Sequence, residues 1–117
     1  MMLKTSPELL ETFKQDILKF KKRPGLYISP PTYSQIATFL QGMNHQADWG
    51  LLYSFPHWLE RKYTISDALI WENSLKSVFE KMPDRIKSDE ELVQFLFENI
   101  LEYIDARLSN PNLPPYL

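Results

Sequence analysis

Residues 88–108, SDEELVQFLFENILEYIDARL, decide the fold of this chain. Ser88 and Glu91 have the spacing of a capping box, and the acids of the first turn suit the positive end of a helix dipole. From Leu92 onward, apolar side chains leave only a narrow polar strip on the helix. A helix that is apolar on so many sides is usually central in a domain or shared with a partner. The stretch therefore predicts a long helix around which the rest of the chain packs.

Working outward, the apolar spacing of three and four residues predicts four further helices. Prolines at positions 24 and 83 end the first and the fourth of them. Between Pro24 and the pair Pro30-Pro31, residues 26–29 are expected to form a looping segment or one short extended segment. We therefore predict an all-α bundle of about five helices in a single domain, 1–108, with an extended proline-rich tail, 109–117. The four additional helices are expected at residues 7–22, 32–49, 56–63 and 66–82.

The composition excludes several classes of protein. The chain has 117 residues, no cysteine and a formal net charge of −2. Without cysteine there is no disulfide and no thiolate nucleophile, as is usual in a reducing cytosol, so we expect a cytoplasmic protein. No apolar run reaches the roughly 18 residues of a membrane span. A charge so close to zero does not indicate a nucleic-acid partner.

No set of residues predicts catalysis, a cofactor or a metal. Of the two histidines, His45 has Asp48 three residues later as a possible second ligand, but no third ligand completes the set that a zinc site requires, and His57 lies beside Trp58. The three glycines are too scattered for a phosphate-binding loop, and no nucleophile-elbow motif occurs. We therefore expect a protein that is not an enzyme.

Charge is distributed unevenly along the chain, and this predicts an interaction surface. Residues 84–105 contain seven acidic and two basic side chains. One interpretation is a solvated helix face, which charge runs usually are. The alternative is an acidic surface that meets a basic protein partner. The candidate contact residues are Asp89, Glu90, Glu91, Glu98 and Glu102.

Residues 21–28, KKRPGLYI, resemble the KRPGMYIG segment near the N-terminus of the DNA gyrase B ATPase domain. In that family an Asp-x-Gly-x-Gly loop follows, together with a helix that carries Glu and Asn. This chain has no Asp-x-Gly-x-Gly, its helix 36–47 lacks the Glu and the Asp-Asn pair, and Ser29 replaces the family's last glycine. The resemblance therefore does not imply ATP hydrolysis.

A second resemblance extends over about 80 residues. Small bacterial cytosolic proteins exist with an RPGMYIG-like turn, followed by an FL-x-G helix end, a Phe-x-x-Trp segment and a lone Trp. This chain is similar at residues 23–28, 39–42, 55–58 and 71, and again at 90–101. The residues of the turn motif are Arg23, Pro24, Gly25 and Tyr27. Some members of that family resemble immunity partners of secreted toxins, so the resemblance implies a protein-binding role.

Together these observations predict a non-catalytic protein-binding domain, with neutralisation of a toxin by occlusion as one form of that function. A first alternative is a small-molecule or enzymatic pocket near Tyr27, His57 and Trp58. A second is a homodimer through the last helix, because Phe95 and Phe97 lie on opposite sides of it.

Overall fold

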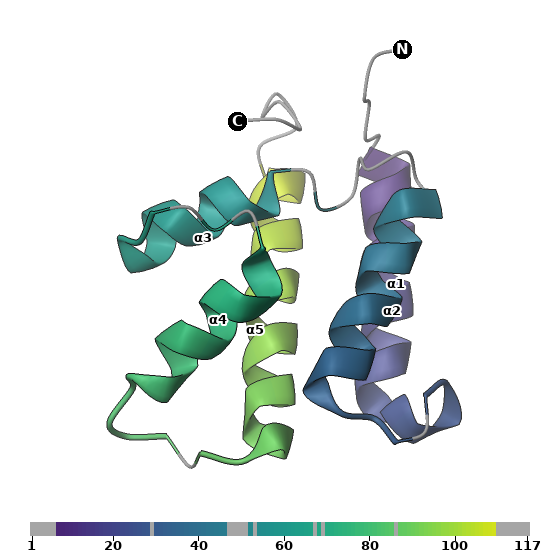
Figure 1. The fold of residues 1–117 in the computed structure, drawn as a ribbon. Coiled ribbons are helices and arrows are strands. Elements are labelled where there is room, and N and C mark those ends of the chain that lie inside the picture. Colours follow the sequence, from purple (N-terminus) through teal and green to yellow (C-terminus); the bar gives the residue numbers. More distant parts are fainter. Residues whose placement is uncertain are drawn as a thin grey trace.

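A computed structural model describes residues 7–28, 30–46, 52, 54–66, 68, 70–85 and 87–109. These residues form five α-helices and one 3-10 turn, without a strand (Figure 1). The prediction of an all-α bundle of about five helices is confirmed. Residues 110–117 of the predicted tail lie outside the described residues. The elements are α1 (Pro7–Lys22), η1 (Pro24–Leu26), α2 (Tyr33–Gln46), α3 (Phe55–Tyr63), α4 (Trp71–Glu80) and α5 (Asp89–Ser109).

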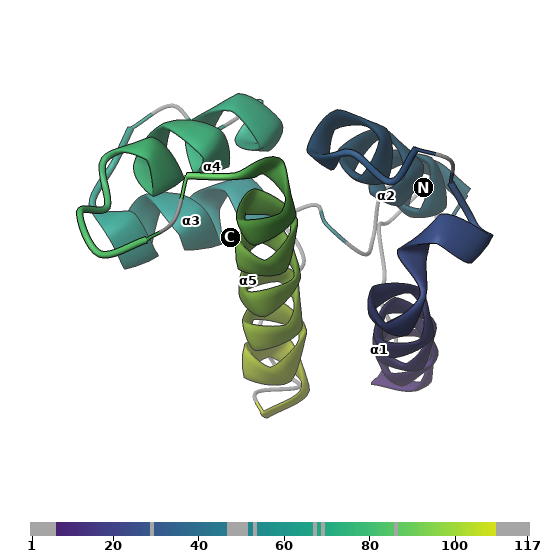
Figure 2. The same cartoon turned by 90° about the horizontal axis from the view of Figure 1, so that it is seen from below.

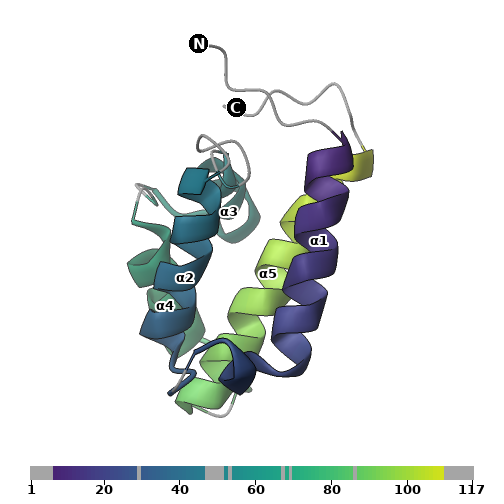
Figure 3. The ribbon, with the colours of Figure 1, turned by 90° about the vertical axis from the view of Figure 1, so that its right-hand side faces the viewer.

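The last helix is central. Figures 1 and 2 show α5 between the α1–α2 pair on one side and the α3–α4 pair on the other, and α5 contacts all four. Its partner α1 runs antiparallel to it (Figure 3). Lys14 forms an ion pair with Asp105 at 2.8 Å, and the Phe20 ring lies 5.7 Å from that of Phe97. Higher residue numbers on α1 therefore meet lower residue numbers on α5, as in any antiparallel pair.

Burial on most sides of α5 explains its unusual composition. Phe95, Leu96 and Phe97 are consecutive and all buried. At about 100° per residue they face more than half of the circle. Phe95 packs against Phe79 of α4 with ring centroids 5.4 Å apart, whereas Phe97 packs against Phe20 of α1. Both rings that suggested a homodimer are therefore covered within one chain.

Hydroxyl caps begin two of the helices, as the sequence predicts. The Gln35 N–H donates to Thr32 Oγ1 at 3.3 Å, and the Glu91 N–H donates to Ser88 Oγ at 3.2 Å. These bonds satisfy amide groups that have no partner inside the helix. Although α5 has 21 residues, no helix in the described part of the chain is long and apolar enough to cross a bilayer.

Two local predictions are wrong. Residues 26–28 are not extended, because Pro24 opens a 3-10 turn and its carbonyl accepts the N–H groups of Tyr27 and Ile28 at 3.1 and 3.0 Å. Proline suits the first position of such a turn, since its fixed φ is already helical. The fourth helix begins at Trp71, later than the predicted residue 66. A loop residue, Ala68, instead donates its N–H to the Glu60 carboxylate at 2.8 Å.

Tyr33 joins α2 to α4 and gives the fold a dependence on alkaline pH. Its buried hydroxyl donates to the Glu72 carbonyl at 2.7 Å. Burial, and then the charge of Glu72, raises the pKa of Tyr33 well above its ordinary value of 10.0. Because the folded pKa is the higher one, this stabilisation is complete below pH 10 and is lost as the pH rises above it.

We expect Tyr33→Phe to lower the free energy of unfolding by about 1 kcal/mol near neutral pH, because one hydrogen bond is lost. The variant should also lose less stability than the parent above pH 10. Urea unfolding across that range measures both effects. Tyr27→Phe, at an exposed ring, is the control. Equal alkaline sensitivity of Tyr33→Phe and the parent would contradict this account.

Candidate functional site

The structure separates the five acidic candidates into two groups. Glu98 accepts Arg85 at 3.0 Å, Glu102 accepts Lys62 at 2.6 Å, and Asp89 accepts the Tyr33 N–H at the start of α2 at 3.0 Å. These three carboxylates therefore bind groups of their own chain. Glu90 is exposed and Glu91 is partly exposed. The acidic surface that remains available to a partner centres on these two residues.

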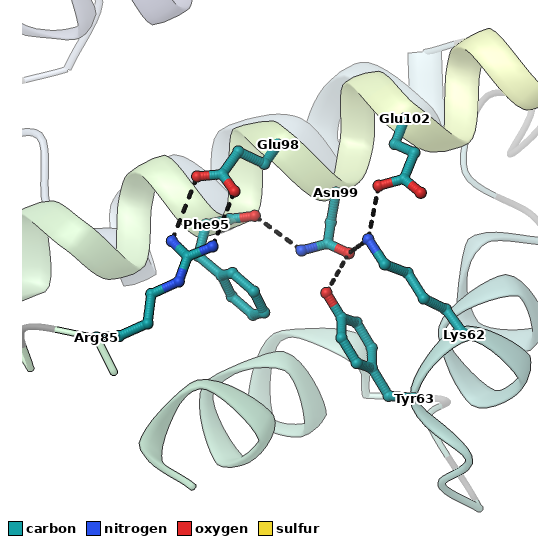
Figure 4. A network of polar contacts seen from close by, with 7 residues as sticks. All are labelled: Lys62, Tyr63, Arg85, Phe95, Glu98, Asn99 and Glu102. Atoms are coloured by element: carbon teal, nitrogen blue, oxygen red, sulfur yellow. Dashed lines mark hydrogen bonds and ion pairs between the residues drawn. The ribbon is translucent and has the colours of Figure 1, made fainter. Parts of the chain in front are cut away.

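One acid–base pair of α5, Glu102 with Lys62, meets a buried amide (Figure 4). Asn99 is only 1% exposed. Its Nδ2 donates to the Phe95 carbonyl, and its Oδ1 accepts the Tyr63 hydroxyl at 2.8 Å and the Lys62 ammonium at 3.0 Å. Every polar atom of this side chain thus has a partner, as burial requires. The network fixes the end of α3 against α5, so its role is structural.

A second acid–base pair, Arg85 with Glu98, lies nearer the N-terminal end of α5. Arg85 donates through two guanidinium nitrogens to Glu98, at 3.0 and 3.3 Å, and lies over the Phe95 ring at 5.0 Å. The hydrogen bond to Glu98 raises the pKa of the Arg85 guanidinium above its ordinary value. The pair holds the segment before α5 to the middle of that helix.

Among the described residues, the RPGLYI turn contains two strongly exposed apolar side chains next to one another in sequence. Leu26 is 74% exposed and Tyr27 is 52% exposed. Arg23 and Gly25 are also exposed, and Pro24 is partly so. The structure thus places the turn motif at the surface, with two apolar side chains largely open to solvent.

Three aromatic rings continue this apolar surface onto α1 and α2. The Tyr27 ring lies 5.3 Å from Phe20 and 6.4 Å from Phe39, which is 37% exposed. Between them is a groove of about 220 Å³, whose walls also include Asp16, Lys19 and Met43. Sequence reasoning assigned Phe39 only to a family motif, and its exposure next to Tyr27 comes from the fold.

Lys19 lines the groove, and two further cations follow it in the sequence. Lys19 and Lys22 lie in the last turn of α1, Arg23 follows directly, and all three are exposed. Within the described residues, none of them is in an ion pair. We name the set the basic–aromatic surface; it consists of Lys19, Lys22, Arg23, Leu26, Tyr27 and Phe39.

The pocket expected near Tyr27, His57 and Trp58 is not formed as a single site. Trp58 packs on Phe55 and Tyr103 in the α3–α5 part of the core, whereas Tyr27 belongs to the basic–aromatic surface. His57 is exposed, with Nδ1 3.4 Å from the Glu60 carboxylate. Among the described residues, no group of three or more His, Asp or Glu side chains is placed to hold a metal. The side chain of His45 lies outside the described residues.

Comparisons of the chain with protein-family models, with curated proteins and with solved structures found no match.

Proposed function

We propose that this protein is a non-catalytic protein-binding domain that contacts its partner through the basic–aromatic surface. The observation that carries the proposal is the exposure of Leu26 and Tyr27 beside an apolar groove. Single exposed apolar residues are ordinary, but contiguous ones bordered by polar groups are typical of interaction sites.

The surface is held in shape before any partner binds. Tyr27 is fixed by the 3-10 turn below it and by ring contacts with Phe20 and Phe39. A side chain that is already ordered loses little entropy when it binds. Tyrosine is also enriched among the residues that dominate binding energy, because its ring is large and has a polar end.

The chemistry of the surface favours an acidic, partly apolar segment of another protein. Lys19, Lys22 and Arg23 would attract carboxylates and increase the association rate. A basic surface with exposed rings can also suit a single-stranded nucleic acid. Here, however, the Asp16 carboxylate lines the groove and would repel phosphates. Leu26, the most exposed large apolar side chain within the described residues, is aliphatic.

Neutralisation of a toxin by occlusion, in the cytoplasm, is the specific form of binding that the sequence resemblance supports. In our proposal the basic–aromatic surface covers the part of the toxin that acts. This differs from the expectation of an acidic contact surface, because three of its five acids are already bound within the chain.

Affinity capture with three baits, the parent protein and two variants, tests the proposal. We expect the parent to recover a stoichiometric protein partner, and the double variant Leu26→Ser/Tyr27→Ser to bind it about 30-fold more weakly, as for residues that dominate an interface. Ile70→Ser removes another exposed apolar side chain, outside the surface, and should leave binding unchanged. Equal binding by all three baits, or the absence of a specific partner, would contradict the proposal.

A further inference from the structure

A second cavity lies between the C-terminal turn of α3 and α4, away from the basic–aromatic surface. Its volume is about 690 Å³ and it is open to solvent. Small-molecule sites usually have volumes of roughly 300 to 1,000 Å³, so this one has room for a ligand the size of a sugar phosphate. Figure 1 shows the two helices that border it side by side.

The wall formed by α4 is a row of hydrogen-bonding side chains. Asn73 and Ser77 lie four residues apart on one face of α4, and Lys81, the C-cap residue that follows the helix, continues the row. The rise of 1.5 Å per residue spreads the row over about 12 Å. Lys81 is the only charged group among the described residues of the lining, and it stands at one end of the row.

The wall formed by the α3 turn adds hydroxyl groups and apolar surface. Thr64 and Ser66 contribute the hydroxyls, and Ile65 contributes the apolar surface together with Val78 from α4. Tyr63 closes one side, and the bond from its hydroxyl to Asn99 keeps the ring in place. Hydroxyls on both walls and an apolar patch suit a molecule that has several hydroxyl groups and exposed C–H faces.

Thr64 has an unusual backbone for its residue type. It caps α3 in the left-handed conformation, with φ 53° and ψ 53°, and no other described non-glycine residue has a positive φ. Glycine usually takes this position, and a β-branched residue there is strained. Strained residues persist where the side chain serves a function. Here the threonine places a hydroxyl on the cavity wall.

We propose that this cavity binds a hydroxylated organic anion of the sugar phosphate or sugar acid class. The anionic group binds Lys81, and the ligand hydroxyls bind the row from Ser77 to Asn73 and the α3 turn. This inference is independent of the proposed protein contact, because the two sites share no residue.

Titration of the ¹⁵N-labelled chain with four probes tests the proposal. Glucose 6-phosphate represents the sugar phosphates, and gluconate represents the sugar acids. Glucose supplies the hydroxyl groups without the anion, and inorganic phosphate supplies the anion without the sugar. We expect one of the two anionic sugars to shift the amide resonances of residues 63–66 and 73–81 at millimolar concentration, with the two partial probes weaker. No shift from either anionic sugar would overturn the proposal, as would inorganic phosphate binding equally well.

Substitutions assign the binding to this cavity. We expect Lys81→Gln to weaken binding about fivefold, as for loss of one exposed ion pair, and Lys81→Arg to retain most of it. Lys76→Gln, an exposed lysine of α4 outside the cavity, is the matched control. Equal affinities for Lys81→Gln and Lys76→Gln would overturn the assignment.

Thr64→Gly separates a binding role from a structural one. Glycine relieves the left-handed strain, so the variant should unfold at the same temperature as the parent or a few degrees higher. If the Thr64 hydroxyl contacts the ligand, the same variant should bind more weakly by about threefold or more, the loss of one hydrogen bond. Unchanged affinity would overturn this part of the proposal.

Discussion

Replacing Phe97 by alanine is expected to lower the free energy of unfolding by about 3 to 5 kcal/mol, the largest stability effect that we predict. The Phe97 side chain is fully buried on α5 and packs edge-on against Phe20 of α1. Alanine would leave a cavity in the contact between α1 and α5. Urea unfolding followed by circular dichroism measures the change.

The same experiment distinguishes a monomer core from a dimer interface. Gln94→Ala, at an exposed position of α5, is the control and should change stability by less than about 0.5 kcal/mol. In a monomer the unfolding midpoint is independent of protein concentration, whereas in a dimer it rises with concentration. A small effect of Phe97→Ala, or a midpoint that follows concentration, would contradict burial of this ring within one chain.

Replacing Asn99 by leucine is expected to cost about 2 kcal/mol, although leucine is similar in size and more apolar. The substitution removes the acceptor that binds the Tyr63 hydroxyl and the Lys62 ammonium. A buried donor left without a partner costs its full desolvation energy, whereas removal of both partners is close to neutral. The loss should therefore come from the groups that remain.

A double-mutant cycle tests that explanation. Asn99→Leu/Tyr63→Phe should recover part of the stability lost in Asn99→Leu, because the unpaired hydroxyl is then absent as well. Strictly additive losses would show that the two side chains do not interact. A neutral or stabilising Asn99→Leu would contradict the view that the polar network of Figure 4 holds α3 to α5.

The helices could be predicted because each depends on local patterns. The apolar spacing of α1 and α5, and the hydroxyls at Thr32 and Ser88, act within one or two turns of the chain. One error was local, because Pro24 opens a 3-10 turn where an extended segment was expected. The other, the start of α4, occurred where a side-chain contact decides the conformation. Ala68 stays outside a helix and bonds to the Glu60 carboxylate, a partner that periodicity does not reveal.

The surfaces were harder to predict than the fold. Leu26 and Phe97 are equally apolar in a sequence, and only packing leaves the first exposed and the second buried. The acidic candidates look exposed and unpaired in the sequence, but the fold brings partners to three of them. Glu102 lies 40 residues from the lysine that binds it, so its pairing with Lys62 could not be foreseen from local charge.

Site-specific photo-crosslinking tests most directly whether the basic–aromatic surface is the contact surface. Benzoyl-phenylalanine is placed at position 27 in one variant and at position 90 in another, and each is irradiated with the captured partner. The proposal predicts a covalent adduct from position 27 and none from position 90, where the remaining acidic surface lies. An adduct from position 90 alone would contradict the proposal and return the binding function to the acidic residues of α5.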